Sequence, residues 1–570
     1  MRSRLPIGPD TGLDADPAVT VGIVSAHGYI LNSPGTFLVD ALRGFVAANP
    51  TIGWEPDPGF LYRRKRGDES LVALVSGGGS GHEPMHAGMI GAGMLDAACP
   101  GLIFTSPNAL QIAGATRWAD RGAGVLHVVK NYTGDTMNFR IARHLLRDEV
   151  ATDHVLVADD VATDSESGPG RRGTAATIVV EKVCGAAAAR GDELAAVTAI
   201  GQRTADNARS VAVAYQACTL PGADGPTFDL AADEMEFGVG IHGEAGVERT
   251  TKVSARELVQ RMVSRIVDAL SLTSGDRVIC VVNGLGAAHP LELSLVFGEA
   301  LADLNGRGIT VERSLVGTYV TALDMAGVSI TLVRTDDEML DLFDTPTDAP
   351  AWPARVSPPA EPVDIAFAEP DDSADSGPES AWLSAFVGRV QDSIDELTEL
   401  DHRAGDGDFG TNMQAALGHF DRPLRGSDAD VLAAIGTSYL VRAGGTSGAV
   451  FGVLFRQLGD AFAENDDFTT ALRDGTSSAL AEVQDLGGAE VGDNTMVDAL
   501  APAAEALNSG ASLGEVADRA EAGAESTRDT VASKGRASYV GDNARGVVDP
   551  GALVVSWLYR AAADPSPTVE

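Results

Sequence analysis

Apolar residues follow two different patterns along the chain. Up to about residue 343, short runs of apolar, often β-branched residues alternate with longer Ala-rich stretches of helical periodicity. Examples of the short runs are LVALV at 71–75, VLHVV at 125–129 and VICVV at 278–282. Continuous apolar runs of this length indicate parallel strands that helices cover on both faces. The pattern therefore predicts an α/β fold for this part of the chain.

The pattern changes after a segment rich in Pro, Asp and Ser at 344–380, which has the composition of an interdomain linker. From there on, helix-forming residues recur at i, i+3 and i+4, and β-rich runs are scarce. We predict a multidomain protein with an α/β domain at 29–343, a linker at 344–380 and an all-α domain at 381–570. A Gly-rich loop followed by an Ala-rich helix places a boundary between two α/β halves near 170–190.

The chain is strongly acidic, which argues against binding to negatively charged partners. Its 81 Asp and Glu residues against 42 Lys and Arg residues give a formal net charge of −39. We therefore expect no binding to nucleic acid or to an anionic membrane surface. Apolar stretches approaching the roughly 18 residues of a membrane span do not occur, so we expect a soluble cytoplasmic protein. The four cysteines lie far apart without C-x-x-C spacing, which predicts buried thiols.

A glycine cluster directly follows the first strong apolar run, in the sequence LVALVSGGGSGHEPMHAG. Glycines such as Gly79 and Gly81 leave the backbone accessible to a small polar ligand. A tight turn between a strand and a helix, without any ligand, is the ordinary alternative for such a cluster. Because His82 follows the glycines at once, we favour a reactive pocket.

Two further polar clusters lie in the first part of the chain. Lys130, Asn131, Thr133 and Asp135 follow the apolar run at 125–129, where open α/β sheets bind their ligands. A cation, an amide and a carboxylate suit a polyol, although a solvated loop with an Asx turn would use the same residues.

The third cluster, EFGVGIHGEAG, places His242 between glycines. Such a histidine does not lie on a helix face, which weakens the interpretation as an ordinary core residue.

Acidic residues form the first candidate site after the linker. The sequence LDHRAGDGDFGTNM brings Asp401, Asp406 and Asp408 together with flexible glycines. Carboxylate oxygens favour Mg²⁺ over zinc, and the spacing differs from that of a calcium-binding EF-hand loop. In so acidic a chain, three neighbouring aspartates can also arise by chance.

Three loops in the last part of the chain combine amides, hydroxyls and arginines, which suit phosphate groups. They are RAGGTSGAVFG, VGDNTM and SKGRASYVGDNARG. The sequence has no Walker-type G-x-x-x-x-G-K-[ST] motif and no properly arranged protein-kinase set of H-R-D and D-F-G, so a nucleotide bound here would use a different scaffold.

Taken together, eight motifs resemble the ATP-dependent dihydroxyacetone kinases, in the form that joins a ketose-binding and an ATP-binding domain in one chain. The motifs are GGGSGHEP, FTSPN, VVKNYTGD, GIHGEAG, LDHRAGDGDFGTNM, GGTSG, GDNTM and GRASYVG, in this order between residues 32 and 552. The resemblance implies two α/β halves, a C-terminal helical barrel and a homodimer.

For the α/β domain, the resemblance implies that His242 forms a covalent hemiaminal with the carbonyl group of the ketose. Asp135 and His82 would then act as acid and base on the terminal hydroxyl group of the substrate. The residues that the resemblance implies in positioning the substrate are Gly79, Gly81, Ser106 and Lys130.

For the helical domain, the resemblance implies that Asp401, Asp406 and Asp408 hold two Mg²⁺ ions on the phosphates of ATP. The residues implied at the nucleotide are Gly445, Thr446, Ser447, Asn494, Thr495, Met496 and Arg536. Asn494 and Asn543 stand where the family commonly has arginine, so we expect some nucleotide contacts to be arranged differently.

The leading hypothesis is an ATP-dependent kinase of dihydroxyacetone. An erythrulose kinase is the alternative within the same class, because this pocket chemistry requires only a carbonyl beside a hydroxymethyl group. A ketose-binding regulator without turnover and a lyase that acts on flavin dinucleotide are alternatives from other classes. Mg²⁺ and ATP are the expected cofactors of the kinase.

Overall fold

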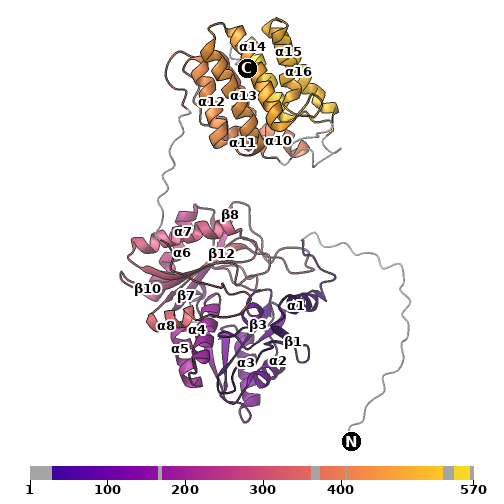
Figure 1. Ribbon diagram of the computed structural model, residues 1–570. Helices are drawn as coiled ribbons and strands as arrows, with labels where there is room; N and C mark the ends of the chain where they lie inside the picture. Colours follow the sequence, from indigo (N-terminus) through magenta and orange to yellow (C-terminus); the bar gives the residue numbers. More distant parts are fainter. Residues whose placement is uncertain (1–27, 165–169, 361–372, 406, 531–544, 565–570) are drawn as a thin grey trace, which may run out of the picture. The chain divides into compact units, whose positions relative to one another are not determined.

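The computed structural model describes residues 28–164, 170–360, 373–405, 407–530 and 545–564 (Figure 1). The chain forms two compact units, residues 1–364 and 365–570, each with its own core. Within the described residues, no helix is long and apolar enough to cross a membrane. All four cysteines are buried and free, as the sequence predicts.

The first unit contains two six-stranded sheets. The first sheet has the order β1 (Ile52–Glu55), β2 (Phe60–Arg63), β4 (Ala97–Ile103), β3 (Ala73–Ser80), β5 (Val125–Lys130) and β6 (Thr152–Val157). Strands β4, β3, β5 and β6 are parallel, whereas β1 and β2 pair antiparallel at one edge. The carboxyl ends of the parallel strands therefore meet along one edge of the sheet, the usual location of ligand sites in such folds.

The second sheet is mostly antiparallel, with β10 and β11 as its parallel pair. Its order is β11 (Thr310–Gly317), β10 (Arg277–Gly284), β12 (Ala326–Arg334), β7 (Ala208–Gln216), β8 (Glu234–Phe237) and β9 (Glu248–Thr251). Helices α6 (Ala255–Leu270) and α7 (Pro290–Gly306) cover one face. The remaining helices of this unit are α1 (Phe37–Ala48), α2 (Ala109–Ala119), α3 (Thr133–Leu146), α4 (Ala176–Arg190), α5 (Leu194–Asp206) and α8 (Asp337–Asp344), with 3-10 turns η1 (Ala87–Met89) and η2 (Val161–Thr163).

Both faces of the first sheet are buried, which explains the continuous apolar runs. On β5, Val125 and Val129 pack with α2 and α3 on one face, whereas Leu126 and Val128 belong to the core on the other face. Helix α4 is the centre of that second core, because it contacts β3, β5 and β6 of the first sheet and β7 and β12 of the second. Every residue of α4 from Ala176 to Ala188 is buried. The helix therefore lies between the two sheets.

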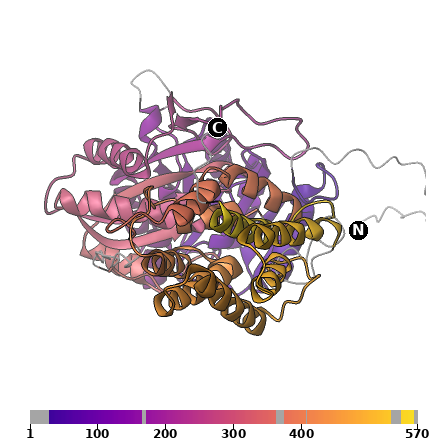
Figure 2. The same ribbon diagram turned by 90° about the horizontal axis from the view of Figure 1, so that it is seen from above.

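The second unit is all-helical in the residues that the structure describes. Its helices are α9 (Ala381–Gln391), α10 (Ile394–Ala404), α11 (Phe409–Leu417), α12 (Asp428–Arg442), α13 (Gly445–Glu464), α14 (Phe468–Gly487), α15 (Val497–Asn508), α16 (Leu513–Ser526) and α17 (Pro550–Ala563), with the 3-10 turn η3 (Thr527–Asp529). From α10 onward, helices that are neighbours in the sequence pack against one another, and α9 contacts both α11 and α17. Figures 1 and 2 show the orange and yellow helices of this unit from two directions. The helices thus close into a ring.

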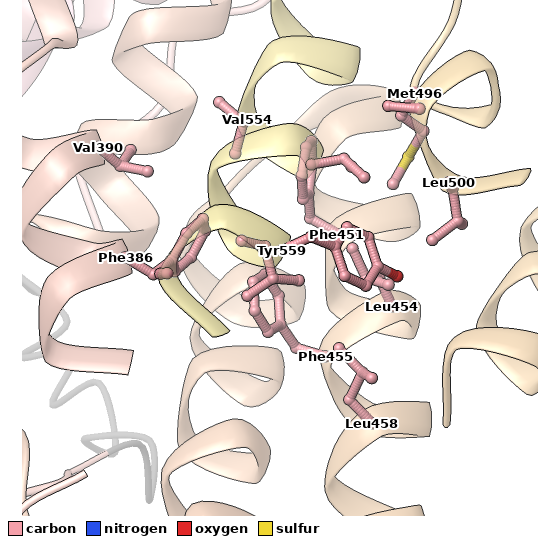
Figure 3. Close-up of a cluster of buried hydrophobic side chains, with 14 of the residues drawn as sticks. Phe386, Val390, Phe451, Leu454, Phe455, Leu458, Met496, Leu500, Val554 and Tyr559 are labelled. Carbon is pink, nitrogen blue, oxygen red and sulfur yellow. The ribbon is translucent and has the colours of Figure 1, made fainter. Parts of the chain in front are cut away.

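Large apolar side chains fill the inside of this ring (Figure 3). Phe451 and Phe455 of α13 stack on Tyr439 of α12, with ring centroids 5.3 and 5.5 Å apart. The ring centroid of Phe386 in α9 lies 5.5 Å from that of Phe455. Contacts between residues so far apart in the sequence hold the helix ends, and the loops on them, in fixed positions.

The predicted fold class, two α/β halves followed by an all-α helical barrel, is thus confirmed. The sequence boundaries at 29–343, 344–380 and 381–570 stay predictions, as does the division near 170–190. Part of the predicted linker, 361–372, lies outside the described residues.

Candidate active site

The predicted glycine cluster lies at the carboxyl end of β3, between β4 and β5. A Cβ atom at Gly78 would come within 2.1 Å of the Nζ atom of Lys130, so only glycine lets the lysine side chain cross this strand. Gly81 adopts a positive φ of 102°, which favours glycine, and the chain then turns into His82. Gly79 packs against the backbone of Phe104 and Thr105. Gly78 therefore leaves room for the buried lysine, and Gly79 allows the close approach of the chain after β4.

His82 and His242 meet although 160 residues separate them in the sequence. Their Nε2 atoms are 3.2 Å apart, and the Nδ1 atom of His82 donates to the carbonyl oxygen of Thr321 at 2.9 Å. Burial, and next the nearby His242, lower the pKa of His82 well below its ordinary value, so the ring is neutral. Its Nε2 atom then lacks a proton, and we assign the shared hydrogen bond as donated by His242.

Aromatic rings and a carboxylate fix the position of His242. The ring of Tyr132 stands edge-on to it at a centroid distance of 4.3 Å, and the ring of Phe104 does so at 5.7 Å. Glu244 accepts a hydrogen bond from the backbone amide of His242 at 2.7 Å and pairs with Arg172 at 3.3 Å. Burial lowers the pKa of His242, which keeps the imidazole neutral and nucleophilic at neutral pH.

Asp135 lies in the first turn of α3 and is only 1% exposed. Both of its carboxylate oxygens are buried without a hydrogen-bond partner. The Nζ atom of Lys130, itself fully buried, is 3.5 Å from Oδ2. A buried carboxylate whose oxygens make no hydrogen bond is costly to maintain, and such costs are typical of groups that act on a ligand.

Ser106, the last predicted substrate contact, comes from the loop after β4. It lies against Gly134 at the start of α3, where a Cβ atom would come within 2.6 Å of its Oγ atom. The predicted residues of the first unit thus come from the carboxyl ends of β3 and β5, from the loops that follow β3, β4 and β8, and from the first turn of α3.

Sequence reasoning missed two residues next to this cluster, His86 and Glu181. The Nε2 atom of His86 is 2.9 Å from the Nζ atom of Lys130, and its Nδ1 atom is 2.5 Å from Oε1 of Glu181. Burial lowers the pKa of His86 and raises that of Glu181 to about 8. A single carboxylate within the apolar, Ala-rich helix α4 was the available signal for Glu181.

The second unit contains a pocket of about 390 Å³, within the size range of small-molecule sites. The N-terminal ends of α11, α13, α15 and α17 all contribute to its lining. Helix N-termini carry free amide groups and a partial positive charge, so four of them together favour an anionic ligand such as a phosphate chain.

Most of the residues predicted in the second unit line this one pocket. They are Asp401, Asp408, Gly445, Thr446, Ser447, Asn494, Thr495 and Met496. Asp406 and Arg536 lie outside the described residues, so their roles stay predictions. The sequence VVDPGA carries no predicted role, yet its Asp549, Pro550 and Gly551 also line the pocket at the start of α17.

The loop before α15 has a defined geometry. Asn494 adopts a positive φ of 62°, and its side-chain amide donates to the carbonyl oxygens of Thr527 and Thr530 at 2.9 and 3.1 Å. The buried carboxylate of Asp498 accepts hydrogen bonds from the amides of Gly492 and Thr495. The Asn494 side chain therefore holds the loop, with its donors directed to protein carbonyls.

Acidic side chains gather at one end of the pocket. Burial, together with the nearby Asp498 and Asp401, raises the pKa of Asp549 to about 7. Asp401 also accepts a hydrogen bond from the amide of Phe409 at 3.0 Å. Among the described residues, no group of three His, Cys, Asp or Glu side chains has the arrangement of a metal site. The donors present are carboxylate oxygens, which fit Mg²⁺.

Comparison with known proteins agrees with both units. Residues 43–351 match the family model of the Dak1 domain, and residues 403–564 match that of the DAK2 domain. A rat protein named triokinase/FMN cyclase is 37% identical over 561 residues, which cover 92% of this chain and 96% of that protein. An L-erythrulose 1-kinase of Mycolicibacterium smegmatis is 36% identical, over 94% of this chain and 99% of that protein.

A solved structure extends the likeness to the fold. The dihydroxyacetone kinase from C. freundii, in complex with AMP-PNP and Mg²⁺, has a TM-score of 0.63 and 31% sequence identity. The match covers 95% of this chain and 100% of that one. An α/β unit with a buried polar site and a helical unit with an anion-favouring pocket thus define a two-unit kinase architecture. The chain belongs to the dihydroxyacetone kinase family, in the form that carries Dak1 and DAK2 domains in one chain.

Proposed function

We propose that this protein transfers the γ-phosphoryl group of ATP to a terminal hydroxyl group of a short-chain ketose, with dihydroxyacetone as the first candidate. The observation that carries the proposal is the buried carboxylate of Asp135, whose two oxygens make no hydrogen bond in a site built of histidines and a lysine. A ligand hydroxyl group would supply the missing partner. The kinases named among the relatives support the same reaction class.

Capture of the ketose follows from the histidine pair. A ring nitrogen of His242 adds to the carbonyl carbon, so that a nitrogen–carbon bond forms and the carbonyl oxygen becomes a hydroxyl group. The basic Nε2 atom of His82, 3.2 Å away, can accept the ring proton that His242 loses and pass it on. A substrate without a carbonyl group cannot form this bond, which selects ketoses over polyols.

Phosphoryl transfer needs a base at the terminal hydroxyl group, and Asp135 is the candidate. As the bond from the γ-phosphorus to ADP breaks and a new bond to the hydroxyl oxygen forms, the hydroxyl proton passes to the carboxylate. Lys130 holds the carboxylate in place, and Gly79, Gly81 and Ser106 would contact the substrate.

In the second unit, the nucleotide phosphates would lie on the amides at the start of α13, at Gly445, Thr446 and Ser447. Asp401 and Asp408, with Asp406 between them in the sequence, would hold Mg²⁺. Bound there, Mg²⁺ neutralises the phosphate oxygens of ATP. The C. freundii kinase binds AMP-PNP and Mg²⁺ in its crystal structure, which supports these two cofactors.

An erythrulose kinase is the second candidate, favoured by the similarity to the M. smegmatis enzyme over nearly the whole chain. Both candidates use the same capture chemistry and differ only in the fourth carbon. The rat relative's name adds a flavin reaction as a side activity to test. A homodimer and a cytoplasmic location stay predictions.

Release of ADP, measured with Mg-ATP and a panel of substrates, tests the proposal. The panel contains dihydroxyacetone, both erythrulose enantiomers, glyceraldehyde and glycerol. We expect turnover with ketoses and none with glycerol. Turnover of glycerol at the same rate would contradict covalent capture. In a separate assay with flavin dinucleotide and Mn²⁺, without ATP or ketose, release of a cyclic flavin phosphate and AMP would favour the flavin reaction.

A further inference from the structure

A chain of four buried polar side chains leads from the interior of the first unit to the candidate base. Oε1 of Glu181 is 2.5 Å from Nδ1 of His86, whose Nε2 is 2.9 Å from Nζ of Lys130. Nζ in turn is 3.5 Å from Oδ2 of Asp135. None of the four residues is more than 6% exposed.

The hydrogen positions in this chain follow from what each group can donate. The side chain of Ser76 donates its proton to the carbonyl oxygen of Val128 at 2.8 Å, so its oxygen can only accept from Nδ1 of His86, 3.1 Å away. Nδ1 of His86 therefore carries the ring proton, and Oε1 of Glu181 is a second acceptor for it. Because the ring is neutral, Nε2 is left as an acceptor for Lys130.

The ammonium group of Lys130 has three donors and no acceptor. One donates to the carbonyl oxygen of Gly77 at 3.1 Å and a second to Nε2 of His86. The third is left for the side of Asp135. The histidine thus fixes the rotation of the ammonium group, and with it the direction of the donor that faces the carboxylate.

We propose that His86 and Glu181 are positioning residues that orient Lys130 toward Asp135, the candidate base. This inference rests on the proposed kinase function, since it names the residues that prepare its reaction. His86 contacts Lys130 and Glu181 contacts His86, so both act on Asp135 through the lysine. Burying a carboxylate and an imidazole in the core between two sheets is otherwise unfavourable compared with apolar residues of similar size.

Glu181→Leu and Glu181→Gln form the central pair of variants. The amide oxygen of glutamine can accept from Nδ1 of His86 as the carboxyl oxygen Oε1 of Glu181 does, whereas leucine removes the acceptor. We expect kcat to fall on the order of 10–100-fold in Glu181→Leu, as for a small misplacement of reacting groups, with the KM for Mg-ATP unchanged. Glutamine should restore kcat close to the parent value.

His127→Gln is the matched control, because His127 is also fully buried and lies on β5, three residues before Lys130. Its Nε2 pairs with Thr116, and its ring packs on Phe139 of α3 on the other face of the sheet. We expect it to leave kcat unchanged. An unaltered kcat in Glu181→Leu, or a loss that glutamine does not restore, would overturn the proposal.

A second measurement does not depend on turnover. In the parent protein, ¹⁵N-histidine NMR reports which ring nitrogen carries the proton, and the signals of His86 are identified by their loss in His86→Gln. We expect the proton on Nδ1 and a bare, hydrogen-bonded Nε2. A proton on Nε2 would overturn the proposal even in an active enzyme. If the parent phosphorylates no ketose while the tautomer is as expected, the proposed function fails and the assigned arrangement of the four side chains stands.

Discussion

Replacing Asp135 by asparagine tests the candidate base directly. The substitution keeps the shape of the side chain but removes the negative charge and the proton acceptor. Because the carboxylate is buried and its oxygens make no hydrogen bond within the described residues, the change affects chiefly the pair with Lys130. Asp135→Asn should therefore separate chemistry from ketose capture, which depends on His242.

The expected size follows from two effects. Loss of a general base lowers kcat by about 10²–10⁴-fold, equivalent to roughly 3–5.5 kcal/mol of transition-state free energy. The charges of Lys130 and Asp135, 3.5 Å apart, attract each other by at most about 5 kcal/mol at an effective dielectric constant near 20. Removing one partner of a buried pair typically costs about 3–5 kcal/mol of stability. The variant should thus be less stable, and its fold must be checked by circular dichroism at the assay temperature.

The assay combines steady-state ADP release with isothermal titration calorimetry of ketose binding. We expect a kcat reduced by at least about 100-fold while the ketose still binds. Asp148→Asn, a change at a side chain that is 83% exposed, is the control and should leave both quantities unchanged. A kcat of Asp135→Asn within a few-fold of the parent would refute the role of Asp135 as base. Weaker ketose binding with a normal kcat at saturation would make it a substrate-positioning residue.

Three further predictions concern other residues. His242→Ala should abolish covalent capture and raise the KM for the ketose steeply; intact-protein mass spectrometry and kinetics measure this, and an unchanged KM would contradict the hemiaminal. Asp401→Asn should raise the Mg²⁺ concentration needed for half-maximal turnover on the order of 10–100-fold, so an identical Mg²⁺ titration would speak against the metal site. The pKa of Glu181 is raised by burial from 4.5 to about 8, so between these values the folded protein binds more protons than the unfolded chain. The free energy of unfolding of the parent protein, measured relative to that of Glu181→Gln, should therefore fall by about 1.4 kcal/mol for each unit of rising pH. Denaturant unfolding at pH 5.5, 6.5 and 7.5 checks the slope, and a pH-independent difference would argue against it.

The fold class could be predicted because strands that are buried on both faces of a sheet have continuous apolar sequences. On β5, Val129 and Val128 face opposite cores, so the strand reads as an uninterrupted apolar run. The position of α4 between the sheets was not predictable. Its residues from Ala176 to Ala188 are buried on all sides and give no face that would indicate a partner.

The candidate site was predictable in part. Lys130 and Asp135 were found because they follow a buried strand, where α/β sheets bind ligands. The family resemblance implied that His82 and His242 act on the same substrate, but the contact between their rings was not predicted, because 160 residues separate the two. His86 was overlooked because its position in the sequence HEPMH does not reveal a contact with Lys130, which comes from another strand.

In the helical unit, the glycine- and hydroxyl-rich loops predicted the phosphate-favouring helix start at Gly445, and its neighbours line the pocket. The contribution of Asp549 was missed. Its side chain caps α17, accepting from the amide of Ala552 at 2.6 Å, and a capping aspartate before Pro550 reads as an ordinary helix start. The proximity of Asp401 and Asp549 comes from the closed ring of helices, which sequence periodicity does not describe.

The most direct test of ketose phosphorylation through His242 is ADP release with Mg-ATP, dihydroxyacetone, both erythrulose enantiomers and glycerol, run with the parent protein and with His242→Ala. We predict turnover of at least one ketose, none of glycerol, and loss of ketose turnover at substrate concentrations near the parent KM in the variant. No ketose turnover by the parent protein, or equal turnover of glycerol, would contradict this function.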